Sequence, residues 1–437
     1  MGGKRQDDGE SEAVKHDDVD AIDPSRVFLA PMVRGSELAF RQLVRQYGVT
    51  VCYSPMLRAA EIIKAYGYYK SKTSKKRQDI DKDEDQEEEA VLHEDGWLLL
   101  NDILVDPHPV VVQLCGNSPS ILQQATQVLL EINQHFVCQI VGIDLNLGCP
   151  QDCAKRGDFG AFLAEDNPQK ACECVSAMRQ AIQKHTTTTF TTTNRPRLSC
   201  KIRLQQDSAQ TVQLAESLAH AGCQLLTIHC RQRTDKHDGI PNLQVARDVV
   251  HVLQEDSSSM PIVLNGWHWK DAPHALASTG AYGVMLARDF LRNPRLLQPQ
   301  QHANNYYPGQ LAAEYLEFAK RHPPPSPMYM KLHLRWIFRA ALEPRDKTIH
   351  PAILYANNNW KPRLWTFLAR PYLTCLEQFR QVVFLYFYHS WQDDNETKED
   401  DNTLLQAAVP ASLQDLAIQH EQQQLITFRS IRYHYNR

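Results

Sequence analysis

Cys149 is the residue of this chain whose type and position are best suited to chemistry. It lies in segment 143–150, which reads Ile-Asp-Leu-Asn-Leu-Gly-Cys-Pro. The apolar, β-rich run at 141–145 predicts a buried strand, and Gly148 and Pro150 end that strand in a tight turn. A thiol at the carboxyl end of a strand stands where α/β barrels place reactive groups. Because most free cysteines are simply buried, the spacing alone leaves a structural and a chemical role equally open.

Short β-rich runs recur along the chain, and helical patterns separate most of them. The candidate strands are 27–31, 51–53, 110–114, 142–145, 198–202, 225–229, 262–265 and 283–287. Amphipathic segments of helical length lie between them, among them 120–135, 167–184 and 208–221. Alternating units of this kind predict an α/β fold, a TIM (β/α)8 barrel, although periodicity alone leaves a doubly wound sheet open.

Composition and charge divide the rest of the chain. We expect a disordered tail at 1–25, a barrel at 26–304, a smaller all-helical domain at 305–391, and an acidic linker with a last helix at 392–437. Within the barrel, 70–95 is a basic run followed by an acidic one, and 185–195 is rich in threonine. Such segments rarely pack, so 70–95 is predicted to be a disordered surface insertion and 185–195 a loop extension.

The overall composition argues against several classes of protein. Of the 437 residues 43% are apolar, and a net charge of −4 by itself says nothing about nucleic acid. The eleven cysteines include no Cys-x-x-Cys pair, so we expect reduced thiols and no metal site. No secretory signal opens the chain and no apolar run is long enough to span a bilayer. These features predict a protein of the cytoplasm, the nucleus or both.

Polar or turn-forming residues follow almost every candidate strand. They are Ala30 to Met32, Gln113, Lys201 to Arg203, His229 to Arg231, Asn265 with Gly266, and Ala287 with Arg288. Each has an ordinary structural explanation when taken singly, since a lysine after a strand is usually solvated. Together they would form a ring at one face of the barrel, which predicts a ligand site.

The residue types of this ring favour a flavin. Gly266 and Gly283 allow close backbone approach to a phosphate, and Arg288 adds a charge-assisted contact. Lys201 and Gln113 suit a polar ring system, because an ammonium stabilises negative charge that develops on reduction. No G-x-G-x-x-G follows any candidate strand. The pattern therefore predicts a flavin mononucleotide (FMN) site better than a nicotinamide site.

Several motifs together resemble those of the tRNA-dihydrouridine synthases. They are Phe-Leu-Ala-Pro-Met-Val at 28–33, Asp-Leu-Asn-Leu-Gly-Cys-Pro-Gln at 144–151, Ala-Lys-Arg-Gly at 154–157, Gly-Ala-Phe-Leu at 160–163, Cys-Lys-Ile-Arg at 200–203, Thr-Ile-His at 227–229 and Leu-Asn-Gly at 264–266. They run in family order over 26–297. Segment 145–163 looks most like the eukaryotic class that acts on D-loop uridines 16 and 17.

The resemblance implies an activity and a set of site residues. In the family, NADPH reduces FMN, hydride goes to C6 of uracil, and a cysteine, here Cys149, protonates C5. Asn146 and Arg203 would bind the uracil. The implied flavin contacts are Pro31, Met32, Val33, Gln113, Lys201, His229, Asn265, Gly266, Trp267, Ala287 and Arg288. Trp267-His268-Trp269 and Asp289 depart from the family pattern, which puts the local loop shape and the phosphate contact in question.

A tRNA substrate requires a surface that binds phosphate. Between Lys320 and Arg380 eleven basic residues stand against three acidic ones, and aromatic residues lie among them. This charge excess predicts that the helical domain binds the tRNA, although most of the aromatics would form its core. We expect a monomer without metal or membrane partners. Two rival interpretations remain, a flavin reductase of a small molecule such as a free pyrimidine, and a tRNA-binding protein without catalysis.

Overall fold

The structure, a computed structural model, describes most of the barrel and the start of the helical region. The described residues are 22–78, 94–185, 195–235, 239–255, 260–298, 308–339, 379–380 and 382–383. The predicted N-terminal tail to residue 21, the acidic part of the charged insertion, the threonine-rich segment 186–194, most of the 305–391 domain and all of 392–437 lie outside these residues.

Parallel strands form a closed barrel. The strands are β1 (Val27–Leu29), β2 (Val51–Tyr53), β3 (Leu57–Arg58), β4 (Pro109–Cys115), β5 (Gln139–Leu147), β6 (Arg197–Leu204), β7 (Leu225–Gln232), β8 (Ile262–Asn265) and β9 (Gly283–Leu286). They pair in the order β2-β1-β9-β8-β7-β6-β5-β4-β3, and an additional β2–β4 pairing closes the ring, with the short β3 extending it beside β4. The predicted TIM barrel is confirmed, and the doubly wound sheet is wrong.

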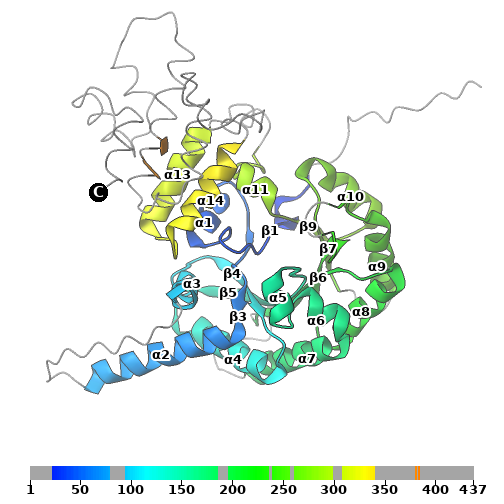
Figure 1. Cartoon of the computed structure of the whole chain (residues 1–437), viewed down its shortest axis with the longest axis horizontal. Helices are drawn as coiled ribbons and strands as arrows, with labels where there is room; N and C mark the ends of the chain where they lie inside the picture. Colours follow the sequence, from blue (N-terminus) through cyan, green and yellow to red (C-terminus); the bar gives the residue numbers. More distant parts are fainter. Residues whose placement is uncertain are drawn as a thin grey trace, which may run out of the picture.

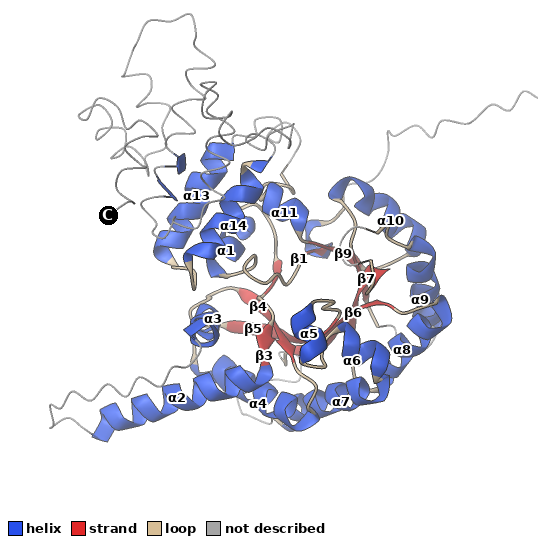
Figure 2. Ribbon diagram, viewed as in Figure 1, coloured by secondary structure: helices blue, strands red, loops and turns tan. Residues whose placement is uncertain are grey.

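Helices surround the strands (Figure 2). They are η1 (Pro24–Arg26), α1 (Leu38–Gln46), α2 (Ala59–Gln78), α3 (Glu94–Leu104), α4 (Pro119–His135), α5 (Asp152–Arg156), α6 (Ala161–Asp166), α7 (Pro168–Lys184), α8 (Ser208–His220), α9 (Leu243–Glu255), η2 (Trp269–Asp271), α10 (Ala272–Thr279) and α11 (Arg288–Arg292). Their apolar faces pack on the strands in one continuous core. In the described ranges no helix has both the length and the apolar character that a membrane span requires.

The strand register brings polar residues of neighbouring strands to the same level. Gln113 pairs with Asp144 across β4 and β5, and Asn146 pairs with Lys201 across β5 and β6. His229 of β7 pairs with Asn265 of β8. Because parallel strands end on the same side of a barrel, this register gathers these side chains at one face.

The prediction of a disordered insertion from residue 70 is wrong at both of its ends. Helix α2 continues to Gln78, and α3 begins at Glu94. Lys70 Nζ lies 2.6 Å from a carboxylate oxygen of Glu131 on α4 and 4.9 Å from the centre of the Tyr66 ring. Lysine, arginine and glutamine are good helix formers, so a basic run with such partners extends a helix. Residues 79–93 lie outside the described part of the chain.

Two helices of the C-terminal region, α13 (Pro308–Arg321) and α14 (Pro327–Ile337), lie against α1 and α11 of the barrel (Figure 1). Glu37, just before α1, is fully buried where α13 and α14 meet the barrel. Tyr315 donates to its carboxylate over 3.0 Å, and His333 Nε2 lies 2.9 and 3.1 Å from its two oxygens. The His333 ring also stacks on Phe40 at 4.2 Å. A buried polar joint therefore attaches the two helices to the barrel.

Candidate active site

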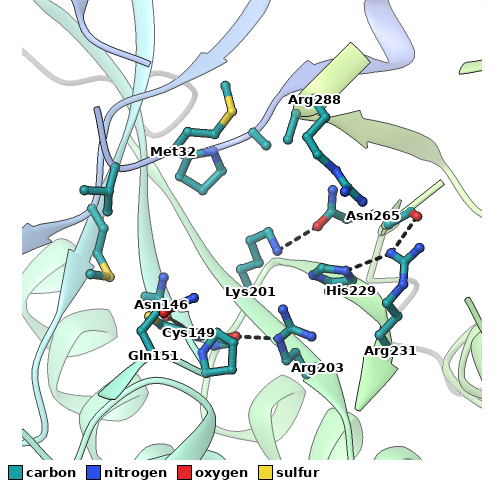
Figure 3. A pocket seen from close by; sticks show the side chains of 18 of the residues that line it. Met32, Asn146, Cys149, Gln151, Lys201, Arg203, His229, Arg231, Asn265 and Arg288 are labelled. Atoms are coloured by element: carbon teal, nitrogen blue, oxygen red, sulfur yellow. Dashed lines mark hydrogen bonds between the residues drawn. The ribbon is translucent and has the colours of Figure 1, made fainter. Parts of the chain in front are cut away.

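A cavity of about 820 Å³ opens at the carboxyl ends of the strands. Figure 3 shows side chains from β5, β6, β7 and β8 directed into it. Every residue predicted for the site lines this cavity: Pro31, Met32, Val33, Gln113, Asn146, Cys149, Lys201, Arg203, His229, Asn265, Gly266, Trp267, Ala287 and Arg288. The structure thus brings the predicted set together, while the role of each residue stays a prediction.

The turn that carries Cys149 is held from inside by Asn146. The Asn146 side-chain oxygen accepts hydrogen bonds from the backbone N–H groups of Gly148, at 3.2 Å, and of Cys149, at 2.9 Å. Arg203 Nε donates to the Gly148 carbonyl over 2.8 Å. These bonds fix the direction in which the thiol leaves the strand.

Gly160 lets the following segment pack directly against this turn. It has φ +66°, and a Cβ there would lie 2.8 Å from the Cys149 carbonyl oxygen. That same carbonyl accepts a hydrogen bond from the N–H of Ala161, at 3.1 Å. Only glycine fits both the backbone conformation and the close approach, which explains the Gly-Ala pair at 160–161.

A buried chain of hydrogen bonds stands behind Asn146. Ser199 donates to one oxygen of Asp144 at 2.6 Å, and the Gln113 amide donates to the other at 2.8 Å. The amide oxygen of Gln113 in turn accepts from Asn146 Nδ2 at 2.8 Å. Since a carboxylate can only accept, Asp144 sets the direction of each following amide and leaves the Asn146 oxygen facing the Cys149 turn.

The Cys149 side chain is partly buried, and burial raises the pKa of its thiol. A backbone hydrogen bond from Gln151 acts in the opposite direction but is the smaller effect. Desolvation disfavours a thiolate, so the group is a neutral S–H near pH 7. A neutral thiol at a cavity wall can donate a proton.

Lys201 places an ammonium on the side of β6 that also carries Ser199 and Arg203. Its Nζ donates to the Asn265 side-chain oxygen over 2.9 Å, and Asn265 Nδ2 donates to the Met285 carbonyl over 2.7 Å. Burial, reinforced by the charge of Arg203, lowers the pKa of Lys201 to about 8. The amine therefore remains mostly protonated at pH 7 but close to its titration range.

Arg231 is a cavity residue to which the sequence gave no role. Its Nη1 lies 3.2 Å from His229 Nε2 and donates to the Gly266 carbonyl over 2.7 Å. Because a guanidinium only donates, His229 Nε2 is the acceptor and the imidazole is neutral. Gly266, at φ +107°, has no room for a Cβ, which would lie 2.8 Å from the His229 ring. The signal was present in the sequence, since Arg231 follows a predicted strand together with His229.

Asp289 explains the unusual loop after β8. One of its carboxylate oxygens accepts from the Trp269 backbone N–H at 2.8 Å, and the other lies 3.1 Å from His268 Nδ1. The two departures from the family pattern, Trp267-His268-Trp269 and Asp289, are therefore in contact, and Asp289 stabilises the loop conformation. Trp267, His268 and Asp289 all line the cavity.

Comparison with protein families agrees with this arrangement. The family profile described as Dihydrouridine synthase (Dus) matches residues 28–347, from the second residue of β1 through the rest of the barrel. The chain belongs to the dihydrouridine synthase family. The match extends through α13 and α14, so both helices are part of what this chain shares with its family.

Relatives of this chain include proteins named for two different pairs of tRNA positions. The tRNA-dihydrouridine(16/17) synthase [NAD(P)(+)]-like protein of Rattus norvegicus is 31% identical over 327 residues, 74% of this chain and 62% of its own length. The 16/17 synthase of Saccharomyces cerevisiae is 30% identical over 329 residues, 73% of this chain and 66% of its own. The 20a/20b synthase-like protein of Homo sapiens is 30% identical over 270 residues, which is 61% of this chain and 69% of its own length. The chain thus spans less than two thirds of the rat relative.

Proposed function

We propose that this protein is a tRNA-dihydrouridine synthase that uses FMN and NADPH to reduce the C5–C6 bond of a D-loop uridine. The observation that carries the proposal is a neutral thiol, that of Cys149, in a cavity that also holds the buried ammonium of Lys201. Family membership and the names of the relatives support a tRNA substrate. We propose positions 16 and 17, because the matches to 16/17 synthases extend over 327 and 329 residues, against 270 for the 20a/20b relative.

The cavity residues fit a flavin mononucleotide. The volume of about 820 Å³ lies within the range of cofactor sites. Met32, Val33 and Trp267 supply apolar walls, and Lys201 and Arg288 supply the cations that a reduced ring and a phosphate require. Bound FMN would supply hydride for the C6 carbon of uracil.

The chain's own contribution to the reaction is proton donation and positioning. Hydride addition at C6 leaves enolate-like charge on the uracil ring, and Cys149 Sγ donates its proton at C5. The raised pKa of the thiol keeps that proton in place until it is needed. Asn146 positions the turn from below, and Arg203, anchored through the Gly148 carbonyl and the Gln232 carbonyl, offers its remaining N–H groups to a base oxygen.

Product formation on unmodified tRNA with NADPH tests the proposal, with dihydrouridine mapped position by position. We expect product in the D-loop. Cys149→Ala should lower the rate of product formation by about 10² to 10⁴ while flavin absorbance and flavin reduction by NADPH remain, since loss of a general acid slows only the chemical step. Cys153→Ala, which alters a second thiol of the same cavity, is the matched control.

The outcomes also separate the rival functions. Equal product from Cys149→Ala would contradict the assignment of the acid. A yellow protein that turns over a free pyrimidine but not tRNA would be a small-molecule reductase. A protein that binds tRNA but holds no flavin and makes no dihydrouridine would be a binding protein without catalysis.

A further inference from the structure

A tryptophan of the C-terminal region forms part of the cavity wall. Trp336 and Leu332 of α14 line the cavity together with barrel residues. They are four residues apart and therefore lie on one face of the helix. The face that packs on the barrel consists of buried residues, among them His333 and Ile337, whereas Trp336 is only partly buried. Trp336 thus packs against the edge of the core and also forms part of the cavity wall.

Two guanidinium groups accompany this indole. Arg292 of α11 lies 5.2 Å from the centre of a Trp336 ring, and Arg339 lies 5.0 Å from it. Trp336, Arg292 and Arg339 are called the tryptophan cluster below. Helix α14 carries no acidic residue. The cluster therefore combines flat stacking surfaces with positive charge, since bases stack on both aromatic rings and guanidinium planes.

The loop after β1 contributes an apolar and exposed side chain to this cavity. Val33, in the loop after β1, lines the same cavity with 62% of its surface exposed. The exposed Val33 and the partly exposed Trp336 are therefore two apolar side chains of one cavity, without a covering element in the described residues. Apolar surface of this kind with arginines beside it is complementary to a nucleobase with its phosphates.

We propose that the tryptophan cluster binds the nucleotide next to the target uridine in the tRNA substrate. The proposal rests on the function proposed above and adds a second recognition site to it. Cys149 comes from the end of β5 and Trp336 from α14, so they occupy different walls of the cavity. A base that reaches the thiol has left its stack, and its neighbour loses that stacking partner at the cavity opening. Stacking on the cluster replaces the lost contact.

The test is a cycle of tRNA affinities that combines a protein change with a substrate change. Trp336→Leu removes the ring, and an abasic nucleotide beside the target uridine, placed on the 5′ side in one tRNA and the 3′ side in another, removes the base. Each change alone should weaken binding by about tenfold, the size of one base–aromatic stack. Together they should weaken it no further on the side where the base stacks. Trp336→Phe should retain most of the affinity.

Tyr282→Leu is the matched control. Tyr282 also has a guanidinium near its ring, that of Arg26 at 5.8 Å, but it precedes β9 and lies at the opposite end of the barrel. The Tyr282→Leu variant should therefore bind tRNA with unchanged affinity. Flavin content and circular dichroism establish that Trp336→Leu is folded and loaded, so that a loss of tRNA affinity reports the missing ring.

Three results would overturn the proposal. Additive losses for Trp336→Leu and both abasic tRNAs would show that the ring does not contact the neighbouring base. A raised KM for NADPH in the absence of tRNA would assign Trp336 to the reductant. An unchanged affinity of Trp336→Leu for intact tRNA would exclude a substrate contact. Because the readout is affinity, absence of dihydrouridine in the unaltered protein would count against the proposed function and not against this site.

Discussion

Exchanging the carboxylate and the amide at positions 144 and 146 tests the hydrogen-bond chain behind the Cys149 turn. In the structure each link has one possible direction, from Asn146 through Gln113 to Asp144. Asn146→Asp alone would place a carboxylate at each end of the Gln113 amide. That amide has one acceptor and one donor end, so one carboxylate must face an acceptor.

The hydrogen bonds of the structure give the expected change in unfolding free energy for each variant. Asn146→Asp loses one buried hydrogen bond of 2.8 Å and leaves a charged acceptor unsatisfied, which should cost about 2 to 4 kcal/mol of unfolding free energy. Asp144→Asn can still accept from Gln113 and donate to Ser199, so it should cost about 1 kcal/mol. In the double variant the Gln113 amide turns over and every link is restored. The double variant should therefore be more stable than Asn146→Asp, with a coupling of about 2 kcal/mol.

Urea unfolding, followed by tryptophan fluorescence at pH 7.5, gives the unfolding free energy of the unaltered protein, the two single variants and the double variant.

Low pH provides a second test, because burial raises the pKa of Asp144 to about 6. A raised carboxyl pKa means that stability is present at low pH and is lost as pH rises through about 6. Protonated Asp144 can donate to Gln113, so the defect of Asn146→Asp should shrink as pH falls through 6. Additive effects, or a defect independent of pH, would refute the directional chain.

Two further predictions concern the ammonium of Lys201 and the joint between barrel and helices. Burial lowers the pKa of Lys201 to about 8, so the ammonium loses its charge as pH rises through that value. The kcat/KM for tRNA should therefore fall near pH 8, and Lys201→Arg should abolish this decline in the measured pH profile. His333→Ala removes a partner of the fully buried Glu37, which should cost about 3 to 5 kcal/mol in urea unfolding. A loss below 1 kcal/mol would show that water replaces the imidazole.

The barrel could be predicted from the sequence because its strands are apolar runs bounded by glycine, proline and polar residues. Their ends could not, since pairing continues into polar residues: β7 runs past His229 to Gln232, where its partner β6 ends at Leu204. The helix through Lys70 was missed for a related reason. Its support comes from Glu131 on another helix, and charge patterning along the chain does not record that contact.

The ring of site residues could be predicted because each follows a strand, and parallel strands end together. Trp336 follows no strand. It reaches the cavity only because α14 packs beside α11, and nothing in the local sequence shows that arrangement. Arg231 was visible at a strand end, but its contacts with His229 and Gly266 depend on the spatial order of β7 and β8.

The joint at Glu37 also bears on how this chain folds during synthesis. His333 lies 296 residues after Glu37, and Tyr315 lies 278 residues after it. A ribosome makes the barrel strands before either partner exists, so the carboxylate of Glu37 stays solvated while the barrel assembles. Its burial is the step that follows emergence of α14. The first helix of the barrel thus reaches its final surroundings among the last.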